Sequence, residues 1–253
     1  MDNGRKLAVV TGASRGIGRS TALAFAKEGY EVWALARSVD ALNTLAMEGD
    51  GKIRALRMDA ENPDDVLAAA KTVLNAGVPT VLVNNAGIAI SAPIKKTSIE
   101  DYRRLMTINL ETPFLLCREF LPPMAEQGFG RVINIASTAA LRGVKYTSAY
   151  CASKHALLGL TRSLALEYAL KNVTVNAVCP GWTDTDMVKS AAENIARTTK
   201  RTFDEARDAL AKMNPMAKLV KPEDVASICV FLASPAAATV TGAAWTVDAG
   251  EAA

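Results

Sequence analysis

The stretch KLAVVTGASRGIGRSTALAFAKEG, residues 6–29, decides the fold. A short apolar run rich in valine is followed by Gly12, Gly16 and Gly18, and then by an amphipathic helical pattern. Glycines directly after a strand allow a tight turn and the close approach of a pyrophosphate to backbone N–H groups. The helix that follows offers the partial positive charge of its N-terminus to the same phosphate. The stretch therefore predicts a strand, a turn and a helix that bind a dinucleotide.

The rest of the chain continues this alternation of strand and helix. Short β-branched runs separated by longer helical patterns are typical of a parallel sheet covered by helices. The predicted strands are 6–11, 30–36, 52–58, 80–85, 131–137, 172–179 and 243–248. The helical patterns lie near 17–28, 39–47, 64–75, 99–109, 112–126, 150–170 and 223–233. We therefore expect one α/β domain over residues 1–253, a doubly wound Rossmann fold with a seven-stranded, mostly parallel sheet and helices on both faces.

One segment departs from the alternation. Residues 186–219 follow the sixth predicted strand and look helical, with a break at TTKRT, residues 198–202. Long excursions of this kind are often lids that close over an active site. We expect a helical lid near 186–219, and a plain pair of surface helices is the alternative.

Composition limits the classes of partner. Half of the 253 residues are hydrophobic, the net charge is +3, and there is no run of five basic residues, which argues against nucleic acid and acidic membranes as partners. The start MDNGRKLAVV lacks a signal-peptide pattern, and no apolar run approaches the roughly 20 residues that span a bilayer. The one histidine, His155, argues against a zinc site, and we expect it to be a packing or interface residue. The chain is thus expected to be a cytoplasmic protein without a metal, whose four cysteines are reduced thiols.

The end of the second predicted strand bears on which dinucleotide binds. Many NAD sites place Asp or Glu there to bind the ribose 2′-OH. Here the strand ends at Ala36, Arg37 and Ser38 follow, and Arg15 lies inside the glycine loop. Two guanidinium groups without a carboxylate favour a 2′-phosphate. We expect NADP(H), with NAD(H) as the alternative because Asp40 is close by.

An ordered set of motifs points to a family. After the glycine loop come NNAG at 84–87, Asn109, Ser137, YCASK at 150–154 and PGWTDT at 180–185. In this order and spacing the set resembles the short-chain dehydrogenase/reductase family, over nearly the whole chain. The TG-x3-G-x-G pattern resembles the compact branch of that family. The resemblance implies an oxidoreductase that interconverts a ketone and a secondary alcohol.

Tyr150 and Lys154 are one helical turn apart, so their side chains share a face of the helix. By resemblance, Tyr150 is the acid in reduction and the base in oxidation, while Lys154 lowers the pKa of its phenol and binds the nicotinamide ribose. Ser137 would donate to the substrate oxygen, and Asn109 would hold a water that links Lys154 to solvent. Each residue taken alone has a structural alternative, as a cap or an amphipathic surface residue. It is the ordered set that favours an active site.

The resemblance also implies the cofactor contacts. The residue that ends the third strand would meet the adenine, the NAG segment would pass beneath the adenosine ribose, and the PGWTDT segment would hold the nicotinamide carboxamide. The predicted cofactor-binding residues are Gly12, Ser14, Arg15, Gly16, Ile17, Gly18, Arg37, Ser38, Asp59, Asn85, Ala86, Gly87, Tyr150, Lys154, Pro180, Gly181, Thr183 and Thr185.

The substrate is expected to be a ketone on a hydrophobic body, because the loop 138–146 is mostly apolar or small. The predicted pocket residues are Thr138, Arg142, Tyr146, Trp182 and Met187. The chain most resembles 3-oxoacyl-thioester reductases, 3-hydroxyacyl-CoA dehydrogenases and polyketide ketoreductases. A free ketone or alcohol, such as a polyketide, steroid, cyclic alcohol or sugar alcohol, is the alternative substrate, and a non-catalytic NADP-binding sensor is the alternative of another class.

The carrier of the acyl group is inferred from basic residues. Acyl-carrier-protein reductases typically have a basic residue just before the GRV strand, where this chain has Glu126, Gln127 and Gly128. Lys171 keeps a second basic position of such enzymes. The lid adds Lys189, Arg197, Lys200, Arg201 and Arg207, which favours a CoA thioester over acyl carrier protein. The family resemblance further implies a homotetramer that uses the helix 150–170 and the C-terminal segment AAWTVDAGEAA.

Overall fold

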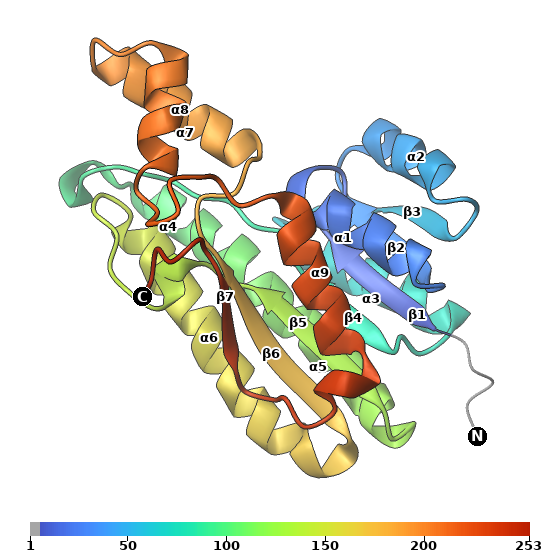
Figure 1. Ribbon diagram of the computed structural model, residues 1–253. Coiled ribbons are helices and arrows are strands. Elements are labelled where there is room, and N and C mark those ends of the chain that lie inside the picture. The colour runs from blue at the N-terminus through green and yellow to red at the C-terminus, as the bar shows by residue number, and fades with distance from the viewer. Residues whose placement is uncertain (1–5) are drawn as a thin grey trace.

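The predicted alternation of strands and helices is confirmed by the computed structural model, which describes residues 6–253 (Figure 1). The strands are β1 Leu7–Thr11, β2 Glu31–Ala36, β3 Ile53–Arg57, β4 Val81–Asn84, β5 Gly130–Ile135, β6 Val173–Pro180 and β7 Ala244–Val247. The α-helices are α1 Gly16–Lys27, α2 Val39–Glu48, α3 Pro63–Ala76, α4 Ile99–Met106, α5 Thr112–Glu126, α6 Ser148–Tyr168, α7 Asp186–Thr198, α8 Phe203–Ala211 and α9 Pro222–Ala233. Shorter helical segments are the 3-10 helices Ile94–Lys96, Thr138–Ala140, Ala169–Lys171 and Pro235–Ala237, and the π-helix Thr107–Glu111.

The sheet has the strand order β3-β2-β1-β4-β5-β6-β7, and every pair of neighbouring strands is parallel. The sheet expected to be mostly parallel is therefore parallel throughout. The chain moves outward from β1 through β2 to β3 and then returns to the other side of β1 with β4. Ligands of such sheets bind outside the carboxyl ends of the strands, at the point where the strand order reverses. That point lies between the loops that follow β1 and β4.

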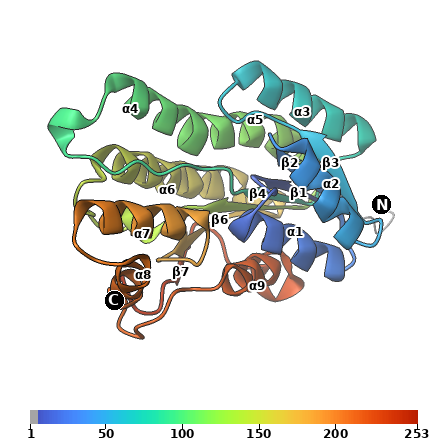
Figure 2. The ribbon, with the colours of Figure 1, turned by 90° about the horizontal axis from the view of Figure 1, so that it is seen from above.

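The two faces of the sheet carry separate cores. On β1, Ala8 and Val10 pack with Phe25 of α1 in one core, while Val9 between them belongs to the other core with Phe120 of α5. This alternation is the period of two expected of a strand that is buried on both faces. Helices α1 and α9 cover the first face, and α3, α5 and α6 cover the second (Figure 2).

The junction between α4 and α5 differs from the prediction. Two helices, 99–109 and 112–126, were expected with a gap between them, whereas the chain is helical from Ile99 to Glu126 through the π-helix Thr107–Glu111. The π-helix ends two residues before Pro113, which has no N–H to donate to a regular helical ladder. Single π turns of this kind are common at functional sites.

The expected helical lid consists of α7 and α8, which extend beyond the sheet (Figure 1). The predicted break falls between Thr198 and Phe203, as expected. The prediction of helix up to residue 219 is wrong, because α8 ends at Ala211 and the chain then turns. Pro215 cannot continue a helix, and Ala217 has a left-handed φ of 50°. Within residues 6–253, no helix is both long and apolar enough to cross a membrane.

Candidate active site

Tyr150 and Lys154 lie in the first two turns of α6, which begins at Ser148. The Lys154 side chain is buried, with 4% exposure, and its Nζ donates a hydrogen bond of 2.9 Å to the carbonyl oxygen of Ile135 at the end of β5. The same Nζ lies 5.9 Å from the centroid of the Tyr150 ring. The phenol and the ammonium are thus brought together at the carboxyl end of β5.

Ser137 follows β5 directly and precedes the 3-10 helix Thr138–Ala140. Its Oγ accepts a hydrogen bond of 3.1 Å from Ala139 N, which fixes the side chain. Ser137 also hydrogen-bonds to the Tyr150 side chain. Ser137, Tyr150 and Lys154 therefore form one cluster.

Burial dominates the protonation of this cluster. It raises the pKa of Tyr150 above the ordinary 10.0, although the hydrogen bond with Ser137 lowers that pKa in part. Burial lowers the pKa of Lys154 to about 8. The expected lowering of the Tyr150 pKa by Lys154 is therefore wrong for this structure, in which desolvation outweighs the other effects and the ammonium is directed at Ile135.

Asn109 lies within the π-helix and is completely buried. Its Oδ1 accepts from Ile88 N at 2.9 Å, and its Nδ2 donates to Ile88 O and to Ser153 Oγ, both at 3.0 Å. Ser153 Oγ in turn donates to the carbonyl oxygen of Tyr150 at 2.7 Å. Ser153 thus links Asn109 to the helix that carries Tyr150 and Lys154. It was missed in the sequence, although its position three residues after Tyr150 puts it on the same side of α6.

The segment after β4 packs against Asn109 and Lys154 on one side and against the glycine loop on the other. A Cβ at Gly87 would lie 3.2 Å from Asn109 Oδ1. The backbone N–H groups of Asn85 and Ala86 both donate to Thr11 Oγ1 at 2.9 Å, and Asn85 Nδ2 donates to Thr11 O at 2.8 Å. The side chain of Asn85 therefore holds the glycine loop. Thr11 was missed in the sequence, although a threonine that ends β1 directly beside the loop was a signal.

The glycines of the loop allow it to pack closely against itself and against the segment after β4. Gly12 has a φ of 64°, and a Cβ there would lie 2.9 Å from Ala86 Cα, while a Cβ at Gly18 would lie 2.4 Å from Gly12 O. Helix α1 begins at Gly16, and within the described chain Arg15 gives its first turn no side-chain cap. Uncapped N–H groups at the start of a helix, next to a glycine-rich loop, fit a pyrophosphate. The loop also holds Ser14 and Ile17, both half-buried.

A cavity of about 440 Å³ lies between the glycine loop and the lid. It is lined by Arg15, Gly16, Asp184, Thr185, Asp186, Lys189, Phe203 and Arg207. Two ion pairs cross this region. Arg15 lies 3.0 Å from Asp186 at the start of α7, and Arg207 of α8 lies 2.7 Å from Asp184. The lid therefore contacts the glycine loop directly.

The turn after β6 is held by its own threonines. Thr183 Oγ1 donates to Gly181 O at 3.0 Å, and Thr185 Oγ1 donates to Thr183 O at 3.2 Å. β6 ends at Pro180, and the Thr185 side chain lies 3.1 Å from the place of a Cβ at Gly16. The structure thus brings the PGWTDT segment to the phosphate end of the glycine loop.

The residues predicted to meet the adenosine lie where β2 and β3 end. Arg37 is 3.7 Å from Glu61, which also pairs with Arg104 at 2.7 Å. No Asp or Glu ends β2, as the sequence shows, but Glu61 from the loop after β3 brings a carboxylate to Arg37. Asp59 Oδ1 accepts from Glu61 N at 3.0 Å, and Ser38 precedes the first residue of α2.

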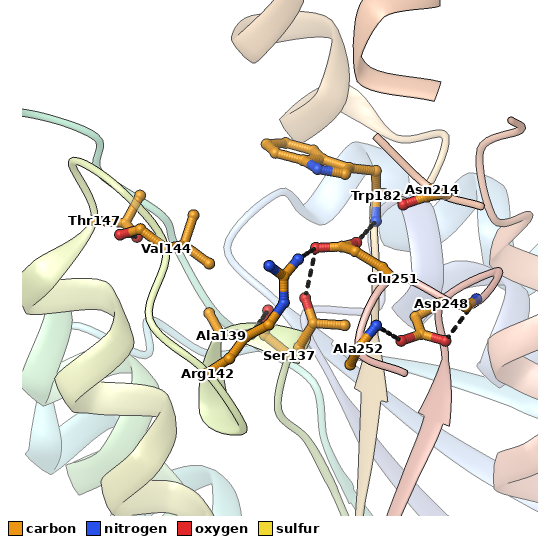
Figure 3. Close-up of polar contacts among 12 residues, drawn as sticks. Ser137, Ala139, Arg142, Val144, Thr147, Trp182, Asn214, Asp248, Glu251 and Ala252 are labelled. Carbon is orange, nitrogen blue, oxygen red and sulfur yellow. Dashed lines mark hydrogen bonds and ion pairs between the residues drawn. The ribbon is translucent and has the colours of Figure 1, made fainter. Parts of the chain in front are cut away.

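Three predicted pocket residues converge on Glu251, a residue that sequence reasoning missed (Figure 3). Thr138 Oγ1 donates to Glu251 Oε1 at 3.2 Å, and Arg142 donates to the same oxygen at 2.5 Å. Trp182 N donates to Glu251 Oε2 at 3.3 Å. The sequence offered one signal, an acidic residue in the otherwise small and apolar end of the chain.

The other predicted pocket residues lie nearer the surface, with Tyr146 55% and Met187 45% exposed. His155 is exposed, and its Nδ1 lies 2.9 Å from the carbonyl oxygen of Cys151. All four cysteines are buried and free. Within the described part of the chain, no three His, Cys, Asp or Glu side chains are grouped to hold a metal ion.

The fold and the site together define a class. A parallel sheet with a glycine loop at its switch point, and a Ser, Tyr and Lys cluster at the end of β5, are features of oxidoreductases that bind a nicotinamide dinucleotide. Residues 12–251 match the family model described as Enoyl-(Acyl carrier protein) reductase. The chain belongs to the short-chain dehydrogenase/reductase family, and it is an NAD(P)-dependent oxidoreductase that acts on hydroxyl or keto groups.

Relatives cover nearly the whole chain. A D-beta-hydroxybutyrate dehydrogenase of Rhizobium meliloti (strain 1021) is 34% identical over 97% of this chain and 98% of its own length. A 3-oxoacyl-[acyl-carrier-protein] reductase of Synechocystis sp. (strain ATCC 27184 / PCC 6803 / Kazusa) is 37% identical over 97% of this chain and 96% of its own length. The crystal structure of a variant of actinorhodin polyketide ketoreductase with NADPH has a TM-score of 0.94 and 34% identity, and covers 98% of this chain and 97% of that one.

Proposed function

We propose that the protein interconverts a 3-oxoacyl and a 3-hydroxyacyl thioester with NADP(H), and that the carrier is CoA rather than acyl carrier protein. The observation that carries the proposal is the cluster of Ser137, Tyr150 and Lys154 beside the glycine loop. A 3-oxoacyl reductase and a D-beta-hydroxybutyrate dehydrogenase among the relatives support a substrate with oxygen at the third carbon. Basic residues at the cavity beneath the lid support CoA as the carrier: Lys189 would meet its phosphates, and Arg207 would do so in exchange for Asp184.

Each residue of the Ser137, Tyr150 and Lys154 cluster has its own role in the reaction. In reduction, Tyr150 gives its phenolic proton to the carbonyl oxygen, and in oxidation it takes the proton of the alcohol. Ser137 donates a hydrogen bond to the same oxygen, where negative charge develops. Lys154 carries an ammonium below pH 8 and presents it to the nicotinamide ribose from its anchor on Ile135. When bound, the nicotinamide supplies or accepts the hydride.

The same residues explain how the cofactor would be held. The uncapped start of α1 and the glycines of its loop take the pyrophosphate. Asn85, Ala86 and Gly87 support the adenosine ribose from the end of β4, and Thr185 supports the carboxamide. NADP(H) is favoured over NAD(H) because Arg37 and Ser38 follow β2, and because the polyketide ketoreductase structure contains NADPH. Arg37 shares Glu61 with Arg104, so a 2′-phosphate would compete with that carboxylate for Arg37.

The test of the reaction is the loss of nicotinamide absorbance with acetoacetyl-CoA, run in parallel with NADPH and NADH. We expect fast consumption of NADPH, and Tyr150→Phe should remove nearly all turnover while NADPH binding stays near normal. Retained turnover in that variant would contradict the role of Tyr150. If neither cofactor is consumed although NADPH binds, the thioester assignment fails.

Cofactor choice has its own test. Arg37→Asp removes a charge-assisted contact to the 2′-phosphate and adds a second carboxylate beside Glu61. We expect the ratio of kcat/KM for NADPH to that for NADH to fall about tenfold or more. Arg118→Asp on α5 is the control and should leave the ratio unchanged. An unchanged ratio in Arg37→Asp would mean that another group reads the phosphate.

A free ketone is the second candidate substrate. The match to the polyketide ketoreductase structure, with a TM-score of 0.94, favours it. A panel of cyclic and polycyclic ketones with NADPH tests this candidate. Turnover of the panel without turnover of acetoacetyl-CoA would select it over the thioester.

We propose that the protein is a homotetramer. Leu166 and Leu170 at the end of the long helix are 84% and 98% exposed, which is unusual for leucine on a monomer surface. A mostly apolar cavity between the π-helix region and α6 adds to this surface; it is lined by Met106, Leu110, Glu111, Phe114 and Leu160. Light scattering should give four times the 26.8 kDa of one chain, and the mass of a single chain would refute the proposal.

A further inference from the structure

The last residues of the chain present a carboxylate to the predicted substrate pocket. Glu251 accepts hydrogen bonds from Thr138, Arg142 and the backbone of Trp182. Its side chain is only 6% exposed, while that of Arg142 is 45% exposed. Thr138, which donates to Glu251, directly follows Ser137 in the sequence. Glu251 is therefore bonded to the immediate neighbour of a residue of the catalytic cluster. Figure 3 shows Glu251 between Arg142 and Trp182.

The end of the chain is shaped to hold Glu251 in this place. Asp248 accepts from Gly250 N at 3.1 Å and from Ala252 N at 2.8 Å, which closes a turn around Glu251 (Figure 3). Ala249 has a left-handed φ of 53°, a conformation that costs an alanine free energy. A Cβ at Gly181 would lie 2.6 Å from Glu251 Oε2. Three separate features, the Asp248 turn, the strained Ala249 and the room at Gly181, thus support one carboxylate.

This arrangement fixes the charge of the pocket. Arg142 would attract an anionic substrate, but its guanidinium is already paired with Glu251. The other basic residue of the loop, Lys145, lies over the ring of Tyr146, 5.3 Å from its centroid. A free 3-oxo acid carries its carboxylate two carbons from the reacting carbonyl, whereas a thioester or ester is neutral there.

We propose that Glu251 is a specificity-determining residue that neutralises Arg142, so that the pocket accepts ketones that are uncharged near the carbonyl and rejects free 3-oxo acids. This inference rests on the proposed function, since it assigns Thr138, Arg142 and Trp182 to the substrate pocket. It narrows the substrate to an esterified acyl group or another neutral ketone. It also separates this enzyme from one that oxidises a free hydroxy acid.

The test compares acetoacetate, an anion, with ethyl acetoacetate, a neutral ester, under saturating NADPH. Wild type should prefer the ester. Glu251→Gln keeps the size and an acceptor oxygen but removes the charge and frees Arg142. We expect the ratio of kcat/KM for acetoacetate to that for the ester to rise roughly tenfold, the size of one charge–charge interaction at about 8 Å at a partly solvated site. The rise should come from a lower KM for acetoacetate.

Two further variants serve as controls. Adding Arg142→Met to Glu251→Gln should abolish the gain, because the guanidinium that Glu251→Gln frees is then gone while Lys145 is unchanged. Glu119→Gln breaks a comparable ion pair with Arg118 on α5 and should leave the ratio unchanged. An equal loss for both substrates in Glu251→Gln would make the residue merely structural and overturn the proposal. A wild-type preference for acetoacetate would overturn it as well.

The test of Glu251 does not require that the protein reduce a thioester. If only cyclic ketones are reduced, 3-oxocyclohexanecarboxylate and its methyl ester replace the acetoacetate pair, and the proposed thioester activity fails separately. If no ketone is turned over, binding of each pair to the protein with NADP+ is followed by tryptophan fluorescence, because the backbone of Trp182 contacts Glu251 directly. The same rise in the affinity ratio is then expected for Glu251→Gln. An unchanged ratio overturns the proposal in either readout.

Discussion

Lys154 keeps a titratable ammonium in a place where water cannot solvate it. Burial lowers its pKa to about 8, while burial raises the pKa of Tyr150 above 10.0. The two groups therefore titrate in separate pH ranges. A change in activity near pH 8 would be assigned to the titration of Lys154, and a change above pH 10 to that of Tyr150.

This separation predicts a pH profile. Since kcat/KM reports the free enzyme, kcat/KM for NADPH at saturating ketone should be level below pH 8 and fall above it, by about tenfold for each pH unit. The physical reason is that neutral Lys154 loses the charge that it presents to the cofactor. Stopped-flow or steady-state rates between pH 6 and 10 measure the profile. A level profile up to pH 10 would show that Lys154 keeps its proton, against the effect of burial.

The residues of the site were predictable where they lie in short motifs and not where a distant partner defines them. Tyr150, Lys154 and Ser137 could be predicted because a fixed spacing sets their relation to helix and strand. Glu251 could not, since its partners Thr138 and Arg142 are 113 and 109 residues away along the chain. A contact of this range follows from the fold as a whole rather than from any local pattern.

Among the helices, α8 depends most on its own ends. It has nine residues, too few for an isolated helix, and it packs on α7 in a small core of the lid. Thr202 and Glu205 form a capping box, with Glu205 N donating to Thr202 Oγ1 at 3.2 Å and Thr202 N donating to Glu205 Oε2 at 2.8 Å. The cap therefore adds to the stability that the packing of α8 on α7 gives the lid.

Thr202→Ala should weaken the lid without weakening the sheet. Losing the cap costs about 1 kcal/mol, and this loss should appear as faster amide exchange over residues 203–211. The melting temperature should hardly change. Ser98→Ala is the matched control, since Ser98 caps α4 in the same way, with a bond of 3.0 Å from Asp101 N, and α4 packs on α6. An equal fall in melting temperature for both variants would mean that the lid and the sheet unfold together.

Elements with a clear hydrophobic period were predicted to within a few residues, and those set by hydrogen-bond register were not. The apolar residues of the strands and of most helices pack into the two cores on the faces of the sheet, so their spacing in the sequence follows the period of the element. The π-helix Thr107–Glu111 was expected as a gap between two helices, because one extra residue shifts the apolar pattern as an interruption of the helix would. Its one local sign was Asn109, a polar residue buried in an apolar run.

At the scale of the whole molecule, the site is assembled by the sheet. The ends of β1, β4 and β5, the start of α6 and the end of the chain meet at one edge, although they span most of the sequence. A parallel sheet puts all carboxyl ends on that edge, which is why motifs after strands carried the functional signal. The prediction that residues 1–253 form one domain stays a prediction.

The buried thiols predict how the whole fold responds to alkali. Burial raises the pKa of Cys117 and Cys229 to about 12 and that of Cys179 to about 11, from an ordinary 9.0. Above pH 9 the unfolded chain therefore releases thiol protons that the folded protein keeps. The free energy of unfolding should fall as pH rises, by about 1.4 kcal/mol per thiol and pH unit. Lys154 acts in the opposite direction between about pH 8 and 10.5, but above pH 9 this one lysine is outweighed by three thiols.

Urea unfolding between pH 8 and 10.5 measures this dependence. The double variant Cys117→Ala and Cys229→Ala should be less stable at pH 8, because each substitution leaves a small cavity. Its stability should nevertheless fall less steeply with pH, since two of the three thiols no longer titrate. The slope, unlike the stability at one pH, is insensitive to the cavities. An identical slope in the double variant and in wild type would place the alkaline sensitivity in other groups.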